Sequence, residues 1–405
     1  MSSPTVPLPL PNSACPFSPA PEIGDIRDSP SLPRVSCPTG IDAWLVTRYA
    51  DVREVLGDTA RFSVRAGMAG HILANTPPGV PAVPGDFSRM DGADHVRFRR
   101  ALAPAMVTAK RMAAIRPVVQ RIVDEAIDDL ATSAQPADLH EQFAKPVSSA
   151  VIAELFGVPA SARELLLDAA EALFRGDADH LEKATAPLYA CMQELITRRR
   201  TEPAEDALGL LVGHPENFTD LELLVGAISV LLAGYDTAAS MISHGAFVLL
   251  ADLARFAPLR EDPALIPGAV EEMVRLLGVG PGRMRVAVTD TEIAGTPIAA
   301  GDYVVVSIQG ANHDPARFPD PGRLDAHRDH RRHLGWGFGP HRCVGQPLAQ
   351  LELTVVFEAL ARRIPSLRLA VPIEDIELET DTPNTSPARL PVAWEEIRPS
   401  RPPLS

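Results

Sequence analysis

The residue with the most distinctive surroundings in this sequence is Cys343. Four glycines surround it, at positions 335, 337, 339 and 345. A helix is predicted to begin just after it, with Pro347 tolerated in the first turn. Such a loop lets the backbone approach a large flat group, and its N–H groups and the helix dipole would stabilise a thiolate. That thiolate could be the only protein ligand of a metal whose other positions are filled, as in haem.

A second candidate lies in the longest proline-free run of the chain, Glu216–Ala257, where a long helix is expected. Within it stands Ala233-Gly234-Tyr235-Asp236-Thr237. The two small residues clear the helix face that carries Thr237, and a mid-helix threonine can bond back to the i−4 carbonyl and bend the helix. Taken alone, the pattern fits a satisfied core threonine beside a solvated aspartate equally well.

Together these segments resemble a known family. Gly335–Gln346 resembles the haem-ligand signature of cytochrome P-450 enzymes, Phe-Gly-x-Gly-x-His-x-Cys-x-Gly, with Trp336 in place of the first phenylalanine. The resemblance implies that Cys343 is the axial thiolate ligand of the iron of haem b, with Gly345 beside the cofactor. The simpler explanation is a buried structural cysteine, and the resemblance argues against it.

The segment on the long helix resembles the family's oxygen-activating motif, Ala/Gly-Gly-x-Asp/Glu-Thr. The resemblance implies that Thr237 orients dioxygen and water and that Asp236 helps to relay protons. Ala233 and Gly234 would border the haem.

Haem carries two propionates, which need cationic or hydrogen-bond-donating partners. Four residues match family positions for this role: His95, Arg99, Arg285 and His341. For any one of them alone, a surface salt bridge would be the simpler interpretation.

Other polar clusters are assigned to structure. Glu272 and Arg275 share a helix face, and Arg323 matches the third member of the family's buried Glu-Arg-Arg cluster. His327, His330 and His333 have a spacing that could suggest zinc, but the segment lacks apolar periodicity, and a polar loop is preferred.

Periodicity predicts a mainly α fold with small β-sheets, and the resemblance implies the cytochrome P-450 fold, with haem between the long central helix and the helix after Cys343. Helices are expected at 50–56, 93–104, 108–132, 140–157, 161–175, 178–201, 219–252, 266–277 and 346–363. Strands are expected at 43–49, 285–288, 292–293 and 303–307. Residues 1–40 read as an irregular proline-rich arm, with ten of the 40 prolines, and 41–405 as one domain.

Composition limits the partners. The 405-residue chain has a net charge of −14, which argues against nucleic acid. Four scattered cysteines fit a reducing, cytoplasmic setting. No signal peptide is recognised, and the apolar run Leu223–Ala251, interrupted by Asp236, is interpreted as a buried core helix with no role in a membrane.

One stretch, from His95 to Val123, lacks acidic residues altogether. Its basic residues are Arg97, Arg99, Arg100, Lys110, Arg111, Arg116 and Arg121. A solvated helix face explains such a stretch about as well as a docking surface does. We expect part of it, with Arg342, to dock an acidic electron donor such as a ferredoxin.

The resemblance therefore implies a monooxygenase that inserts one atom of O₂ into a mid-sized hydrophobic substrate, such as a macrolide, polyketide, terpenoid or steroid. Arg283 could meet a polar or acidic substituent of it. Three alternatives are weaker. A haem protein that only binds and does not oxidise, or a variant that uses peroxide, would not need Asp236 and Thr237. A hydrolase would need Cys343 and His341 as a catalytic dyad, and residues two apart are poorly placed for that.

Overall fold

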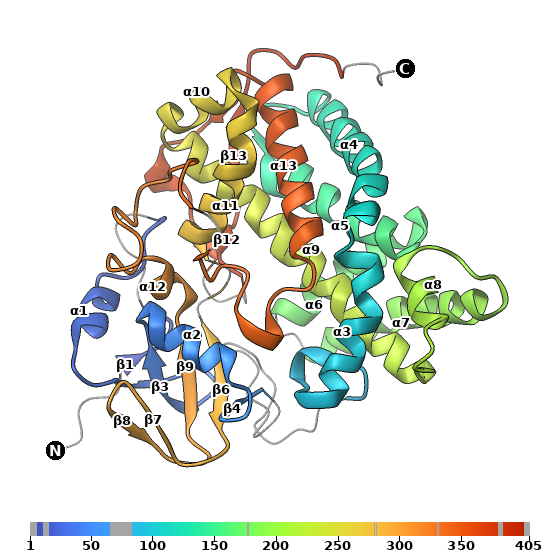
Figure 1. Cartoon of the computed structure of the whole chain (residues 1–405). Coiled ribbons are helices and arrows are strands. Elements are labelled where there is room, and N and C mark those ends of the chain that lie inside the picture. The colour runs from blue at the N-terminus through green and yellow to red at the C-terminus, as the bar shows by residue number, and fades with distance from the viewer. Residues whose placement is uncertain are drawn as a thin grey trace.

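The computed structural model of the chain describes residues 6–10, 16–64, 83–175, 178–278, 280, 282–329, 332–379 and 384–400. The helices are α1 Glu22–Asp28, α2 Tyr49–Gly57, α3 Gly92–Met106, α4 Ala109–Ala131, α5 Lys145–Phe156, α6 Arg163–Arg175, α7 Ala178–Thr201, α8 Ala207–Val212, α9 Asp220–Leu250, α10 Leu253–Glu261, α11 Ile266–Leu277, α12 Ile308–Asn312 and α13 Gln346–Arg363. They fill most of the molecule, while the largest sheet lies at one end (Figure 1). The expected mainly α fold with small sheets is confirmed.

That largest sheet has the strand order β1-β2-β3-β9-β6-β4. Its strands are β1 Val6–Pro7, β2 Arg34–Ser36, β3 Asp42–Val46, β4 Phe62–Ser63, β6 Arg283–Ala287 and β9 Tyr303–Val306. Three smaller sheets pair β10 Arg368–Leu369, β13 Pro391–Ala393 and β5 Ala137–Asp138, then β11 Leu378–Glu379 with β12 Ser386–Pro387, and β7 Thr291–Ile293 with β8 Thr296–Ile298. β6 pairs antiparallel with β9, with Arg283 opposite Val306 and Arg285 opposite Val304.

The long helix α9 forms the axis of the helical region. It starts with a capping box, in which the Glu222 amide donates to Thr219 Oγ1 at 3.2 Å and the Thr219 amide donates to Glu222 Oε2 at 2.8 Å. Among the described residues, α9 is the single helix long and apolar enough to cross a membrane, yet 67% of its most apolar window is buried in the protein. Because α5, α7, α10, α11 and α13 all pack on it, its apolar surface serves as core.

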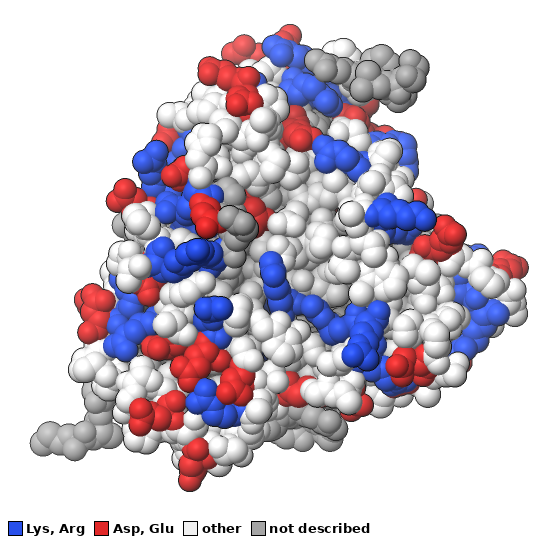
Figure 2. Space-filling view, in the orientation of Figure 1, with Lys and Arg blue, Asp and Glu red and all other residues white. Residues whose placement is uncertain are grey.

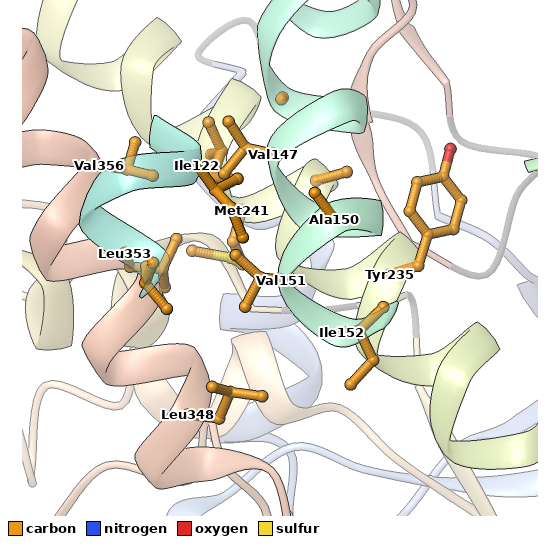
Figure 3. Close-up of a cluster of buried hydrophobic side chains, with 14 of the residues drawn as sticks. Ile122, Val147, Ala150, Val151, Ile152, Tyr235, Met241, Leu348, Leu353 and Val356 are labelled. Atoms are coloured by element: carbon orange, nitrogen blue, oxygen red, sulfur yellow. The ribbon is translucent and has the colours of Figure 1, made fainter. Parts of the chain in front are cut away.

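The core beneath the site is built where α4, α5, α9 and α13 meet. Figure 3 shows side chains from these helices converging. The labelled residues are Ile122, Val147, Ala150, Val151, Ile152, Tyr235, Met241, Leu348, Leu353 and Val356. This packing holds the middle of α9 and the start of α13 in a fixed relation.

Several elements differ from expectation. The first forty residues contribute β1, α1 and β2, and β2 pairs with β3, so part of the arm belongs to the main sheet. The expected helix at 140–157 is a π-helical turn over His140–Ala144 followed by α5. The short helices α8, α10 and α12 were not expected. Most of the expected loop Arg65–Met90 lies outside the described residues, and Phe87–Arg89 within it forms a 3₁₀ turn.

Candidate functional site

The loop before α13 is held in a tight turn around Cys343. The Cys343 amide donates to the Trp336 carbonyl at 2.8 Å, and the Gly337 amide donates to the Leu334 carbonyl at 2.8 Å. Gly339 has φ +72°, and a Cβ there would lie 2.6 Å from the carbonyl oxygen of Leu56. A side chain at this position would therefore force α2 and the loop apart.

The Cys343 sulfur accepts hydrogen bonds from the backbone amides of Gly345 and Gln346, where α13 begins. This confirms that N–H groups point at the sulfur. Burial raises the pKa of the thiol, while these amides and the charges of Arg99 and Arg283 oppose that rise. A bound metal ion would decide the balance, since a coordinating thiol is deprotonated.

The middle of α9 presents a small polar break in an apolar helix. Thr237 Oγ1 donates to the Ala233 carbonyl at 2.7 Å, which is the expected i−4 bond. Ala233 is exposed although most of α9 is buried. Gly234 has a packing role that was not expected, because a Cβ there would lie 2.8 Å from Cδ1 of Ile152. Its small size lets α5 approach α9.

Asp236 is largely enclosed by protein, and burial raises the pKa of its carboxyl group. Asn384, just before β12, donates a hydrogen bond from Nδ2 to Asp236 Oδ2, which acts in the opposite direction on the pKa. Glu379 raises the pKa further and Lys145 lowers it. A carboxyl group that holds its proton more tightly than usual is suited to relaying one.

The proposed propionate partners gather from three elements. His95 and Arg99 lie one turn apart on α3, and the His95 ring stacks on the His341 ring with centroids 4.2 Å apart. His341 Nε2 lies 2.8 Å from Asp91 Oδ1, and Arg99 Nη1 donates to the Arg342 carbonyl at 2.7 Å. Burial lowers the pKa of His95 to about 4, with His341 and Arg99 adding to the effect, so His95 is neutral at pH 7.

Arg285 on β6 joins this group. Its Nη1 donates to the Met284 carbonyl at 2.8 Å, but its buried Nε has no hydrogen-bond acceptor among the described residues. Burial lowers its pKa to about 10, with Arg283 adding to the effect and Asp91 opposing it. A buried guanidinium with an unused donor is costly unless an anion approaches it.

These features fit haem. Cys343 is accessible although protein surrounds its thiol on most sides, so it faces a recess of the fold. Ala233 is also accessible, on α9. The recess offers a thiol, and Arg285, with its unused donor, lies on the strand whose Arg283 interacts with Cys343. A flat, partly apolar group with two carboxylates and a metal that accepts a thiolate satisfies all of these groups at once.

The supporting ion cluster requires one correction. Glu272 and Arg275 form the expected pair, with Arg275 Nε 2.7 Å from Glu272 Oε1 and both side chains about 1% exposed. The third member is Arg328, whose Nε lies 3.0 Å from Glu272 Oε2. Arg323 is exposed in a turn and contributes its carbonyl, which accepts from Arg275 Nη2 at 3.1 Å. The cluster fixes the chain that leads into the Cys343 loop.

The histidines considered for zinc have other surroundings. His333 Nε2 lies 2.8 Å from Glu271 Oε2, and its Nδ1 accepts from the Gly335 amide at 3.1 Å. His330 lies outside the described residues. Within the described part of the chain, no three histidine, cysteine or acidic residues form a metal-binding group.

Sequence reasoning missed three contributors to the site. Asp91 orients His341, Asn384 holds Asp236, and Arg328 completes the ion cluster. Each acts across a large sequence separation and stands in a turn or loop, so neither periodicity nor local spacing marks it.

Comparisons with known proteins agree with this site. Residues 260–364 match the family model Cytochrome P-450. The chain is 38% identical to the mycinamicin IV hydroxylase/epoxidase of Micromonospora griseorubida, covering 92% of this chain and 94% of that one. It is 38% identical to the vitamin D3 dihydroxylase of Streptomyces griseolus, covering 95% and 96%. The crystal structure of CYP105P1 in complex with filipin I superposes with a TM-score of 0.89 at 39% identity, covering 97% of this chain and all of that one. The chain therefore belongs to the cytochrome P-450 family of haem-iron monooxygenases, which act on organic substrates with O₂.

Proposed function

We propose that this monooxygenase uses haem b bound through Cys343 and inserts one oxygen atom into a mid-sized apolar natural product by hydroxylation, epoxidation or a related oxidation. The observation that carries the proposal is the Cys343 sulfur at the start of α13, held by the amides of Gly345 and Gln346 and accessible from a recess of the fold. When bound, haem supplies the iron that reduces dioxygen with electrons from a separate donor.

The residues of α9 manage protons in this proposal. Thr237 keeps its hydroxyl on the Ala233 carbonyl and can turn it to hold a water or an oxygen atom on the exposed face of the helix. Asp236 holds a proton more tightly than a solvated carboxyl group, because it is buried. It would pass that proton toward Thr237. The hydrogen bond from the Asn384 amide would hold the Asp236 carboxyl group in one orientation before the transfer.

Four donors would hold the propionates: Arg285, Arg99, His95 and His341. The unused Nε of Arg285 and the buried His95 ring support this assignment. His341 would be oriented through Asp91, which also accepts from Ser63 Oγ at 2.6 Å and so ties β4 to the Cys343 loop.

The class of substrate is inferred from relatives and from the wall of the site. Two relatives are named for oxidising a macrolide, mycinamicin IV, and a secosteroid, vitamin D3, and another is named pentalenic acid synthase. The described part of the expected wall includes Val230–Tyr235 of α9, which is mostly apolar. The segment 384–387 is described and contains β12, whereas the expected segments at 65–90, 174–181 and 279–284 are only partly described.

A ferredoxin would deliver the electrons on the face that carries α3 and the start of α13. Figure 2 shows basic side chains crossing the middle of this face. Arg100, Lys110 and Arg342 are exposed, and within the described part of the chain none of them forms an ion pair. Arg97 is less suitable than expected, because its Nη1 lies 2.6 Å from Glu222 Oε1 and its charge is already matched.

We further propose that residues 41–405 act as one domain in the cytoplasm, with the N-terminal arm attached through β2. The pairing of β2 with β3 and the packing of α9 against helices from α5 to α13 support one cooperative body. The four cysteines, far apart in sequence, fit a reducing compartment.

The test is the reduced-CO difference spectrum of the wild type and of Cys343→Ala. The wild type should show the red-shifted Soret band of a thiolate-bound haem, and Cys343→Ala should lose it. The matched control is Cys191→Ala on α7, which should keep the band because Cys191 is remote from the loop. A wild type without the band, or a Cys343→Ala variant that retains it, refutes the assignment.

A further inference from the structure

Strand β6 directs two arginines to one side of the main sheet. Arg283 and Arg285 stand two residues apart, so their side chains leave the strand on the same face. Met284 and Val286 point the other way, into the apolar cluster with Val305. Both guanidiniums therefore project toward the side of the sheet that carries the candidate site.

The two arginines have different neighbours. Arg285 interacts with Asp91, which also binds His341, and so stands with the proposed propionate partners. Burial lowers the pKa of Arg283, and the one group that opposes this effect is Cys343. Arg283 is thus close enough to the sulfur for their charges to interact, whereas no such interaction links Arg285 to Cys343.

Arg283 also lacks a partner. Within the described part of the chain it has no hydrogen bond and no ion pair, and no carboxylate influences its pKa. Residues 65–82, which lie outside the described ranges, contain no aspartate or glutamate in their sequence. Its side chain is half-buried, and a guanidinium partly withdrawn from water without an anion carries a desolvation cost.

Haem does not account for this charge. Two propionates already have four donors, in Arg285, Arg99, His95 and His341, and the iron takes the thiolate of Cys343. A guanidinium that remains unmatched beside the same recess requires an anion that arrives with another molecule. The planar fork of arginine favours a carboxylate, which it binds through two parallel hydrogen bonds.

We propose that Arg283 binds a carboxylate on the organic substrate, so that the enzyme selects apolar molecules carrying one acidic group. The inference rests on the proposed function, because the space that Arg283 addresses is the one beside the haem. In a chain of net charge −14, a local cation also offsets the repulsion that an acidic substrate meets on entry.

The test uses 1-phenylimidazole and its ortho, meta and para carboxylates as probes in the holoenzyme. The imidazole nitrogen coordinates haem iron and shifts the Soret band, so a Kd is measured for each probe without turnover.

In the wild type, at least one carboxylate should bind about tenfold or more tighter than the neutral parent, as expected for a charged hydrogen bond. Arg283→Gln should lose this preference and keep the affinity for the neutral parent within about twofold. Arg283→Lys should retain part of it, and the remote control Arg121→Gln should retain all of it.

Three results would overturn the proposal: no carboxylate preferred by the wild type, a preference that survives in Arg283→Gln, or equal loss of haem retention and neutral-probe affinity in that variant. The last result would make Arg283 a propionate partner. Absence of any Soret shift with the neutral probe would refute the haem site itself, and with it both proposals.

Discussion

At the scale of single residues, the hydrogen bond from Asn384 to Asp236 connects the C-terminal part of the chain to the proton path on α9. Asp236 is surrounded by protein, and the Asn384 amide is the strongest influence that lowers its pKa against the rise due to burial. The position of this carboxyl group depends on a residue 148 positions further along the chain.

Replacing Asn384 by alanine should therefore raise the pKa of Asp236 and free its carboxyl group to rotate. We expect slower product formation, by about tenfold, with more of the consumed reducing equivalents released as hydrogen peroxide. The alkaline limb of the pH–rate profile should move up, because a carboxyl group of higher pKa keeps its proton to higher pH. The measurement is product and peroxide per NADH oxidised, with Asn384→Ser as a control that retains a hydrogen-bond donor. Unchanged coupling and an unchanged pH profile in Asn384→Ala would contradict this role.

Residues with local signatures could be predicted, and residues that depend on a distant contact could not. The Cys343 loop and the Thr237 back-bond follow from spacing within a few residues, and both are confirmed. Arg323 was chosen for the ion cluster from its place in a motif, yet the guanidinium that reaches Glu272 belongs to Arg328. Which arginine points inward is decided by the turn after Pro321, whose geometry the sequence pattern does not specify.

At the scale of elements, the extent of α9 could be predicted from the proline-free run Glu216–Ala257, whereas the packing role of Gly234 could not. The glycine contacts Ile152 of α5, and a contact between helices is invisible to a pattern within one helix. The same limit applies to α8, α10 and α12, whose five to nine residues carry too little periodicity to be recognised.

The contact between α13 and α5 contains an acidic residue that the proposed reaction does not use. Glu352 is 3% exposed, and burial raises its pKa to about 8, against which a hydrogen bond with Ser148 acts. Ser148 Oγ in turn donates to the Tyr235 carbonyl at 2.7 Å. The protonated form fits this arrangement, because its O–H can donate to the Ser148 oxygen.

We expect Glu352 to make the fold less stable as the pH rises. The native state keeps the proton up to about pH 8, whereas the unfolded chain releases it near pH 4.3. Between these values the free energy of unfolding should fall by up to about 1.4 kcal/mol per pH unit from this group alone. Glu352→Gln should remove that contribution, so the difference in thermal midpoint between variant and wild type should grow in the variant's favour from pH 5 to pH 8. The control is Glu358→Gln on the same helix, where the carboxylate is partly exposed and pairs with Arg116. Parallel pH curves for Glu352→Gln and the wild type would contradict the prediction.

At the scale of the whole molecule, the net charge of −14 conceals an uneven distribution. Basic side chains cross the middle of the face formed by α3 and the start of α13, and acidic side chains gather toward its edges (Figure 2). Two arginines of the basic stretch His95–Val123 already form ion pairs within the protein. Arg116 pairs with Glu358 at 2.9 Å, and Arg121 pairs with Glu125 at 3.2 Å. The charge left for a partner includes Arg342 beside Cys343, which under the proposed function is where electrons would enter.

This distribution predicts which substitutions weaken docking of a ferredoxin. Arg100→Glu and Arg342→Glu should each lower the rate of ferredoxin-dependent reduction about tenfold at low ionic strength, because they reverse an exposed, unmatched charge. They should also flatten the dependence of that rate on salt, since fewer attractive charges remain to be screened. Arg121→Glu, at an already paired position on α4, should change the rate little. The measurement is stopped-flow reduction under CO from about 20 to 300 mM salt, with the reduced-CO spectrum checking that the loop is intact. Equal losses in all three variants would indicate a response to net charge alone and would exclude a docking surface at this face.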